Sequence, residues 1–172
     1  RLDRVIELAQ ALDFVHGGSG LGTMMHRDIK SANVGFGQDG RLKLMDFGLS
    51  RMVAPHDALE NDTYKMTGEV GSFRYMAPEL VRREPYNAKA DIYSWAILSW
   101  EILAVLRPYN TVVQSTFIQR VVIDGERPQL QKRWPDRLCS LLSSAWHADF
   151  NERPTATAVV AALNSIRAEL QA

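Results

Sequence analysis

The sequence of 172 residues predicts a mainly α-helical domain that carries one small β-hairpin. Two observations lead to this fold class. Apolar residues recur at three- and four-residue spacing along several long segments, which is the period of an amphipathic helix. Two short apolar runs flank Gln38-Asp39-Gly40, and an Asp-Gly pair between such runs is a strong signal for a hairpin turn. A chain of this length buries about 70% of its unfolded surface, so it can form its own core.

The predicted helices follow one another with prolines at the breaks. The first covers RLDRVIELAQALDFVH, residues 1–16, whose leucines and valines fall on one helical face. Thr155 is the predicted N-cap of the last helix. Four further helices are predicted over residues 91–105, 111–124, 136–147 and 155–169, separated by Pro108, Pro128, Pro135 and Pro154.

Two segments near the hairpin are predicted to be irregular. Residues 16–24, HGGSGLGTM, contain four glycines in nine positions, which disfavours both helix and strand. The hairpin strands are expected within residues 33–37 and 41–45. Residues 49–77 have weak periodicity and many Thr, Asn, Asp and Gly residues, so we expect a long irregular segment of the kind that is often functional.

Composition argues against several classes of partner. Twenty basic residues balance 20 acidic ones, so the net charge of zero predicts no attraction to nucleic acid. The most apolar run, residues 92–106, is interrupted by polar residues and is shorter than the roughly 20 apolar residues of a membrane span. Cys139 is the only cysteine and fits a reducing compartment. We therefore expect a cytoplasmic protein with no membrane span.

Four polar residues of the segment HRDIKSANVGFGQDGRLKLMDFG suit phosphate chemistry. Magnesium prefers oxygen ligands and typically takes one or two from the protein, with phosphate oxygens and water completing its shell. Asn33 and Asp46 meet that demand. Asp28 then remains available to accept a proton from a hydroxyl, and Lys30 to neutralise phosphoryl charge. Each residue alone is ordinary, because such side chains commonly form turns or face solvent.

Three strings in this order resemble the eukaryotic protein kinases. Residues 26–33 resemble the catalytic loop of that family, residues 46–48 its metal-binding triplet, and residues 77–79 the end of its activation segment. The resemblance implies an enzyme that transfers a phosphoryl group from ATP, with Mg²⁺, to a protein hydroxyl. A small-molecule phosphotransferase is disfavoured, because residues 67–79 resemble a peptide-binding segment that such enzymes lack.

The resemblance assigns a role to each residue of the set. Asp28 is the expected catalytic base, Asn33 and Asp46 the magnesium ligands, and Lys30 the contact to ATP phosphate and the transferred group. Lys30 two positions after Asp28 is similar to the pattern of serine/threonine kinases. The strings TGEVGSFRYMAPE, DIYSWAILSWE and WHADFNERP are most similar to the tyrosine-kinase-like branch of those enzymes.

Further residues are expected to support the site. By resemblance, His26 and Phe47 are buried supports, and Asp91 accepts hydrogen bonds from backbone amides of the catalytic loop. A simple N-cap of the following helix is the alternative role for Asp91, and both roles are compatible. Arg153 is expected to pair with Glu79, the last residue of the Ala-Pro-Glu string. Removing one partner of a buried pair of this kind strongly destabilises the fold.

Regulation by phosphorylation is implied by Arg27. In kinases with arginine at this position, a phosphate on the activation segment pairs with it and orders the loop. Thr67 lies closest to the usual site, with an unmodified loop threonine as the alternative. Ser72 is a second candidate, but it resembles the residue that bonds the catalytic aspartate and lysine. An upstream kinase or autophosphorylation, and a role in signal transduction, are implied.

The resemblance covers the whole chain but only one lobe of the kinase fold. Residues 1–172 correspond to the large, C-terminal lobe of the two-lobed α+β fold, with the catalytic loop at 26–33, the activation segment at 46–79 and a helical subdomain at 80–172. No Gly-rich phosphate loop or strand lysine precedes the catalytic loop, and GSGLG at residues 18–22 follows no strand. We therefore expect a fragment that is inactive alone, derived from an active kinase.

A catalytically inactive, pseudokinase-like module that only binds proteins is the alternative. Four intact site residues favour the enzyme for the parent protein, and the missing small lobe favours the module for this chain. Gly35 also departs from the family pattern, because kinases usually place an aliphatic side chain there, under the adenine ring. This departure predicts reduced nucleotide affinity.

Overall fold

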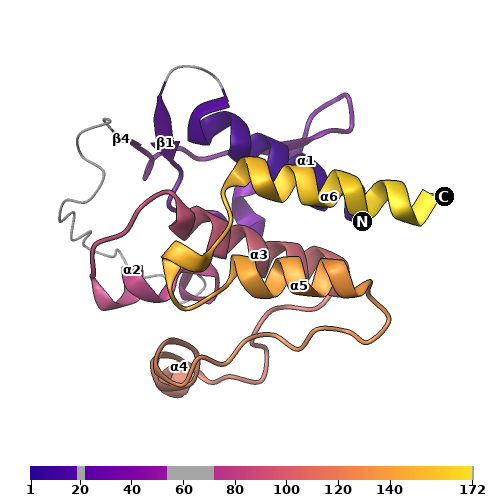
Figure 1. Ribbon diagram of the computed structural model, residues 1–172. Coiled ribbons are helices and arrows are strands. Elements are labelled where there is room, and N and C mark those ends of the chain that lie inside the picture. The colour runs from indigo at the N-terminus through magenta and orange to yellow at the C-terminus, as the bar shows by residue number, and fades with distance from the viewer. Residues whose placement is uncertain (19–21, 54–71, 172) are drawn as a thin grey trace.

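A computed structural model describes residues 1–18, 22–53 and 72–171 (Figure 1). Helices make up most of these residues, and the strands form two small antiparallel sheets. The prediction of a mainly helical domain with a small hairpin is confirmed. Within the described ranges, no helix combines the length and the apolar character needed to cross a bilayer.

Four longer helices build the core around one buried helix. The central helix, α3, is closely surrounded, so apolar residues occur all around it rather than on one stripe. Its Tyr93, Trp95 and Ile97 side chains are fully buried. Helix α3 lies between α1 and α5, and α6 packs along α1 (Figure 1). The bounds are Leu2–Asp13 for α1, Lys89–Ala104 for α3, Asp136–Ala145 for α5 and Ala156–Gln171 for α6.

Short helical turns join these helices. Helix α4 begins at Gln114 and passes into a π-helical turn at Ile118, so the predicted helix over 111–124 is present but starts later and changes type. Thr155 Oγ1 accepts a hydrogen bond from the Ala158 amide at 3.2 Å, which confirms the predicted N-cap. The short elements are η1 Phe14–Gly18, η2 Ser31–Asn33, η3 Ser72–Tyr75, α2 Pro78–Arg82, α4 Gln114–Phe117, η4 Ile118–Ile123 and η5 Phe150–Glu152.

The predicted hairpin is present around the Asp-Gly turn. Strand β2, Val34–Phe36, pairs antiparallel with β3, Leu42–Leu44, and Gly35 lies opposite Lys43. Gly40 adopts φ +69°, a left-handed conformation that glycine accommodates without strain. Its amide donates to the carbonyl of Gly37 at 2.9 Å and closes the turn.

A second sheet contradicts two of the loop predictions. Strand β1, Thr23–Met25, pairs antiparallel with β4, Arg51–Val53, in segments expected to be irregular. The prediction was wrong for these residues because three-residue strands are too short to show a period of two. The pairing joins the segment before residues 26–33 to the segment after Asp46, so it holds both parts of the candidate site together.

One buried hydroxyl on α3 carries a stability prediction. Ser99 is fully buried, and its Oγ has no hydrogen-bond partner within the described residues. Burying an unpaired hydroxyl costs about 1–3 kcal/mol, so Ser99→Ala should raise the free energy of unfolding by about 1 kcal/mol in urea titrations. Ser94→Ala on the same helix is the matched control, because Ser94 Oγ donates to the Tyr75 carbonyl at 2.7 Å. This control should lower stability; equal effects of the two substitutions would contradict the explanation.

Candidate active site

The backbone at Met45 brings the two halves of the catalytic segment together. The Met45 amide donates to the Asn33 carbonyl at 2.9 Å, which extends the β2–β3 ladder by one pair. On the other side, His26 Nε2 donates to the Met45 carbonyl at 3.0 Å. Asp46 follows directly, so these two bonds fix it next to Asn33.

Asp28, Lys30 and Asn33 form one hydrogen-bonded group. Lys30 Nζ lies 2.8 Å from Asp28 Oδ2, and Asn33 Nδ2 donates to the same oxygen at 2.9 Å. Asn33 Nδ2 also donates to the Asp28 carbonyl at 2.8 Å. Within the described residues, Asp28 Oδ1 has no hydrogen-bond partner. One carboxylate oxygen is thus held in place, and the other is available to a substrate.

Two residues of the site have left-handed backbone conformations. Arg27 has φ +66° and Asp46 has φ +59°. For residues with a Cβ, this region costs roughly 1–2 kcal/mol each, and such strain is concentrated at functional sites. The Asp46 carboxylate remains exposed, with Oδ1 accepting the Gly48 amide at 3.2 Å. The strained turn therefore presents an acidic side chain to solvent next to Asn33.

Asp91 accepts hydrogen bonds from the backbone of the catalytic segment, as predicted. Its Oδ2 accepts the His26 amide and its Oδ1 accepts the Arg27 amide, both at 2.8 Å. These bonds restrain the strained backbone of Arg27. His16 Nε2 adds a third bond to Oδ2 at 2.9 Å, with both side chains nearly buried. No sequence pattern indicates this contact, because a glycine-rich segment separates His16 from the catalytic segment.

The alternative role of Asp91 as a helix N-cap is not seen. Helix α3 begins at Lys89, so Asp91 occupies the third helical position rather than the cap. The side chain of Asn87 instead accepts the Lys89 amide at 2.9 Å. The helix starts two residues earlier than predicted, and the Asp91 side chain bonds to the neighbouring loop and to His16.

The two predicted supports differ in burial. His26 is fully buried, as expected. Its ring packs edge-on against Phe47, with centroids 4.8 Å apart. Phe47 is 41% exposed, however, so the prediction of a buried side chain was wrong for this residue. The physical reason is that Phe47 uses one edge against His26, while the described part of the chain leaves much of its other face uncovered.

Arg27 reaches across to the segment that follows Asp46. Its Nε donates to the Leu49 carbonyl at 2.6 Å, and Nη1 donates to the Tyr86 hydroxyl at 3.0 Å. Thr67 lies outside the described residues. Ser72 begins η3, but its side chain is not among those that the structure describes. Both regulatory assignments therefore stay predictions.

The predicted pair between Glu79 and Arg153 is present and buried. Arg153 Nη1 and Nη2 donate to the two Glu79 oxygens at 2.6 and 2.9 Å, and the side chains are 0% and 4% exposed. Arg153 Nε also donates to the His147 carbonyl at 2.8 Å. Its guanidinium lies over the ring of Tyr93, 5.2 Å from the centroid. The pair joins α2 to the segment before α6.

A series of hydrogen-bonded side chains, which was not predicted from the sequence, joins the catalytic segment to η3. The Ser31 hydroxyl lies 3.1 Å from the Tyr75 hydroxyl, which donates to Glu101 Oε2 at 2.6 Å. Burial, reinforced by the hydrogen bond to Glu101, raises the pKa of Tyr75 to about 12, so its hydroxyl keeps its proton. No motif predicts a contact over 44 residues.

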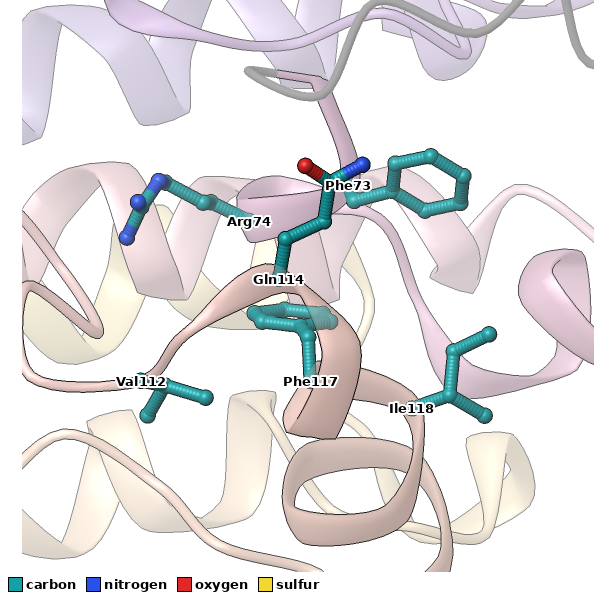
Figure 2. A pocket seen from close by; sticks show the side chains of 6 residues that line it. All are labelled: Phe73, Arg74, Val112, Gln114, Phe117 and Ile118. Atoms are coloured by element: carbon teal, nitrogen blue, oxygen red, sulfur yellow. The ribbon is translucent and has the colours of Figure 1, made fainter.

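A cavity of about 160 Å³ is lined by residues of η3 and of the segment 112–118 (Figure 2). Arg74 is fixed in its wall, because Nη1 donates to the carbonyls of Pro108 and Tyr109, each at 2.8 Å. The cavity is mainly apolar, and none of its lining residues was predicted individually as a site residue, although Phe73 and Arg74 lie within the predicted activation segment, 46–79. The lining residues are Phe73, Arg74, Val112, Gln114, Phe117 and Ile118.

Comparison with known proteins identifies the family. The family model described as protein tyrosine and serine/threonine kinase matches residues 1–163. Serine/threonine-protein kinase STY46 of Arabidopsis thaliana is 32% identical over 96% of this chain, which spans 27% of that protein. Serine/threonine/tyrosine-protein kinase HT1 of Arabidopsis thaliana is 31% identical over 92% of this chain and 38% of its own length.

A third relative comes from another organism. Dual specificity protein kinase shkB of Dictyostelium discoideum is 36% identical over 77% of this chain and 20% of its own length. The chain thus spans well under half the length of the curated relatives it matches. The motifs, the buried Glu79 and Arg153 pair and the family match agree. The chain belongs to the protein tyrosine and serine/threonine kinase family.

Proposed function

We propose that this chain supplies the catalytic half of an ATP-dependent protein serine/threonine kinase. The observation that carries the proposal is the arrangement of the Asp28 carboxylate. Lys30 and Asn33 hold Oδ2, which leaves Oδ1 to accept the proton of a substrate hydroxyl. The hydroxyl oxygen then bonds to the γ-phosphorus of ATP as the bond to ADP breaks, and Lys30 offsets the negative charge on the transferred group.

The residues beside Asp28 fit Mg²⁺ with a phosphate ligand. Asn33 uses its Nδ2 toward Asp28, so its Oδ1 remains as an oxygen ligand, and Asp46 supplies an exposed carboxylate. Among the described residues, no three His, Cys, Asp or Glu side chains cluster as a metal site. One carboxylate and one amide suit magnesium, which takes further ligands from phosphate and water. When bound, the metal would neutralise charge on the ATP phosphates.

A protein hydroxyl on serine or threonine is the proposed acceptor. STY46 is named a serine/threonine-protein kinase, HT1 a serine/threonine/tyrosine-protein kinase and shkB a dual specificity protein kinase. Lys30 follows the serine/threonine pattern. The strings around residues 67–79 support the tyrosine-kinase-like branch. We assign the catalytic loop to 26–33, the activation segment to 46–79 and the helical subdomain to 80–172.

Phosphorylation is the proposed form of regulation. Arg27 lies against the segment after Asp46, through Leu49, and phosphorylation of Thr67 or Ser72 by an upstream kinase or in cis would add a partner for its charge. This chemistry fits a role in intracellular signalling. The isolated chain, which contains no strand lysine for the ATP phosphates before residue 26, is proposed to be inactive by itself.

Nucleotide titration tests the proposal. In the full-length protein, MgADP at 100 times its dissociation constant should raise the free energy of unfolding by about 2.7 kcal/mol, seen as a thermal shift. Asp46→Asn should weaken this effect, because it removes the only carboxylate proposed to bind the metal. Asp39→Asn is the matched control, since Asp39 lies in the exposed hairpin turn. Stabilisation that persists in excess EDTA would contradict the proposed metal site.

A further inference from the structure

Two side chains of α1 bind the β2–β3 hairpin. Glu7 Oε2 accepts a hydrogen bond from the Leu42 amide at 3.1 Å, at the start of β3. Arg4 Nη1 donates to the Gly40 carbonyl at 2.8 Å, and its guanidinium lies over the Phe36 ring, 5.1 Å from the centroid. Helix α1 therefore contacts the hairpin at its turn and at both of its strands.

Arg4 and Glu7, which we call the α1 anchor, also bind each other. Arg4 Nη1 donates to Glu7 Oε2 at 2.7 Å. This hydrogen bond lowers the pKa of the Glu7 carboxyl below its usual value, so the side chain keeps its charge at neutral pH. One carboxylate oxygen thus accepts both a guanidinium of its own helix and a backbone amide of the hairpin.

The Leu42 amide lies on the outer edge of the hairpin. Hydrogen-bonded pairs alternate along an antiparallel ladder, and the Met45 amide bonds to the Asn33 carbonyl across it. Leu42 lies three residues before Met45, so its amide points away from β2. A two-stranded sheet is marginally stable by itself and needs another element to pack against it. The α1 anchor supplies a partner that β2 cannot offer.

The open end of the same hairpin carries both proposed magnesium ligands. Asn33 directly precedes β2, and Asp46 follows Met45, the residue after β3. The bond between the Met45 amide and the Asn33 carbonyl is the last pair of the ladder before the two ligands. Opening this pair would separate Asp46 from Asn33. The position of β3 therefore sets the spacing of the two ligands.

We infer that Arg4 and Glu7 are positioning residues, which hold β3 in the register that keeps Asp46 beside Asn33 for magnesium. This inference rests on the proposed function. The anchor acts through the hairpin backbone and not by contact with the metal. Glu7 is the more buried of the two side chains, 20% exposed against 42% for Arg4. Because Glu7 also binds the strand itself, its removal should have the larger effect.

Hydrogen exchange of the full-length protein, without nucleotide or magnesium, tests the first step. Glu7→Ala removes the acceptor of the Leu42 amide, so β3 should open more often and the Met45 amide should exchange about fivefold faster. Glu7→Gln keeps an oxygen acceptor and should stay within about twofold of the wild type. Asp3→Ala is the matched control on the same helix, because the Asp3 side chain is 73% exposed. It should leave the exchange rate unchanged.

Calorimetric titration with MgADP tests the second step. Glu7→Ala should raise the dissociation constant of MgADP about fivefold, and Arg4→Met about threefold. ADP in excess EDTA does not use the Asn33 and Asp46 pair, so its affinity should change by less than about twofold. Glu7→Gln and Asp3→Ala should bind MgADP like the wild type. Circular dichroism melting curves check that each variant is folded. If Glu7→Ala does not fold, Arg4→Met carries both measurements, since its side chain is more exposed.

The outcomes separate this inference from the proposed function. Unchanged exchange at Met45 in the anchor variants, or faster exchange with unchanged MgADP affinity, would overturn the positioning role and leave the proposed function standing. Equal losses for MgADP and for ADP in EDTA would also overturn it, because the effect would then not lie at the metal ligands. Glu7→Gln that behaves like Glu7→Ala would exclude the bond to Leu42 as the link. Absence of any wild-type MgADP binding would remove the proposed function and this inference together.

Discussion

Replacing Asp28 by asparagine is expected to lower the rate of phosphate transfer by about a thousandfold, within the range that general-base groups contribute. Asparagine has nearly the shape of aspartate, and its amide oxygen can still accept the bonds from Lys30 and Asn33. Its amide nitrogen, in the place of Oδ1, cannot take a proton from the substrate hydroxyl. The loss should therefore fall on turnover and not on folding or nucleotide affinity.

The measurement is single-turnover transfer from ATP to a serine-containing peptide by the full-length protein. MgADP affinity and the melting temperature are measured in parallel and should stay near wild-type values. Asp39→Asn makes the same chemical change at an exposed position in the hairpin turn and should leave turnover unchanged. Retention of more than a tenth of wild-type turnover by Asp28→Asn would refute its role as base.

Local patterns explain which parts of the fold could be predicted. The hairpin follows from Asp39-Gly40 between two apolar runs, and the longer helices follow from apolar residues at helical spacing. Thr155 could be predicted as an N-cap because the amide that its side chain binds lies only three residues later in the sequence. Each of these features depends on residues close in sequence, so the physical cause is visible in the sequence itself.

Contacts between distant segments could be predicted only through family resemblance, or not at all. The resemblance placed Asp91 beneath the catalytic segment and paired Glu79 with Arg153, and both contacts are present. It did not predict the bond from His16 to Asp91 or the contact between Ser31 and Tyr75. Such contacts depend on how helices pack, and no local periodicity records that packing.

Burial of single side chains was the least predictable property. Phe47 was expected to be buried because of its motif, yet its exposure depends on what covers it rather than on its neighbours in sequence. Gly35 was expected to reduce nucleotide affinity because it has no side chain, and in the structure the Met45 side chain occupies the space that such a side chain would take. In both cases the missing information lies in a neighbouring segment, so the residue type alone could not decide the outcome.

Replacing one partner of the buried pair between Glu79 and Arg153 should have the largest effect on stability. The Glu79 side chain is 4% exposed in the structure, and Arg153→Met removes its partner, so we expect the free energy of unfolding to fall by about 3–5 kcal/mol. The loss should be measured as a shift of the urea midpoint. Arg137→Met is the matched surface control, because Arg137 pairs with Glu169 while both side chains remain more than half exposed. The control should change stability by less than about 1 kcal/mol.

A double variant separates the buried charge from the lost packing. Glu79→Leu together with Arg153→Met removes both charges, so it should recover about half of the stability that Arg153→Met loses. Full recovery is not expected, since Arg153 also donates to the His147 carbonyl, which then loses its partner. If the double variant is as unstable as Arg153→Met, the loss comes from the bond to the His147 carbonyl and from the contact with Tyr93 rather than from an unpaired carboxylate.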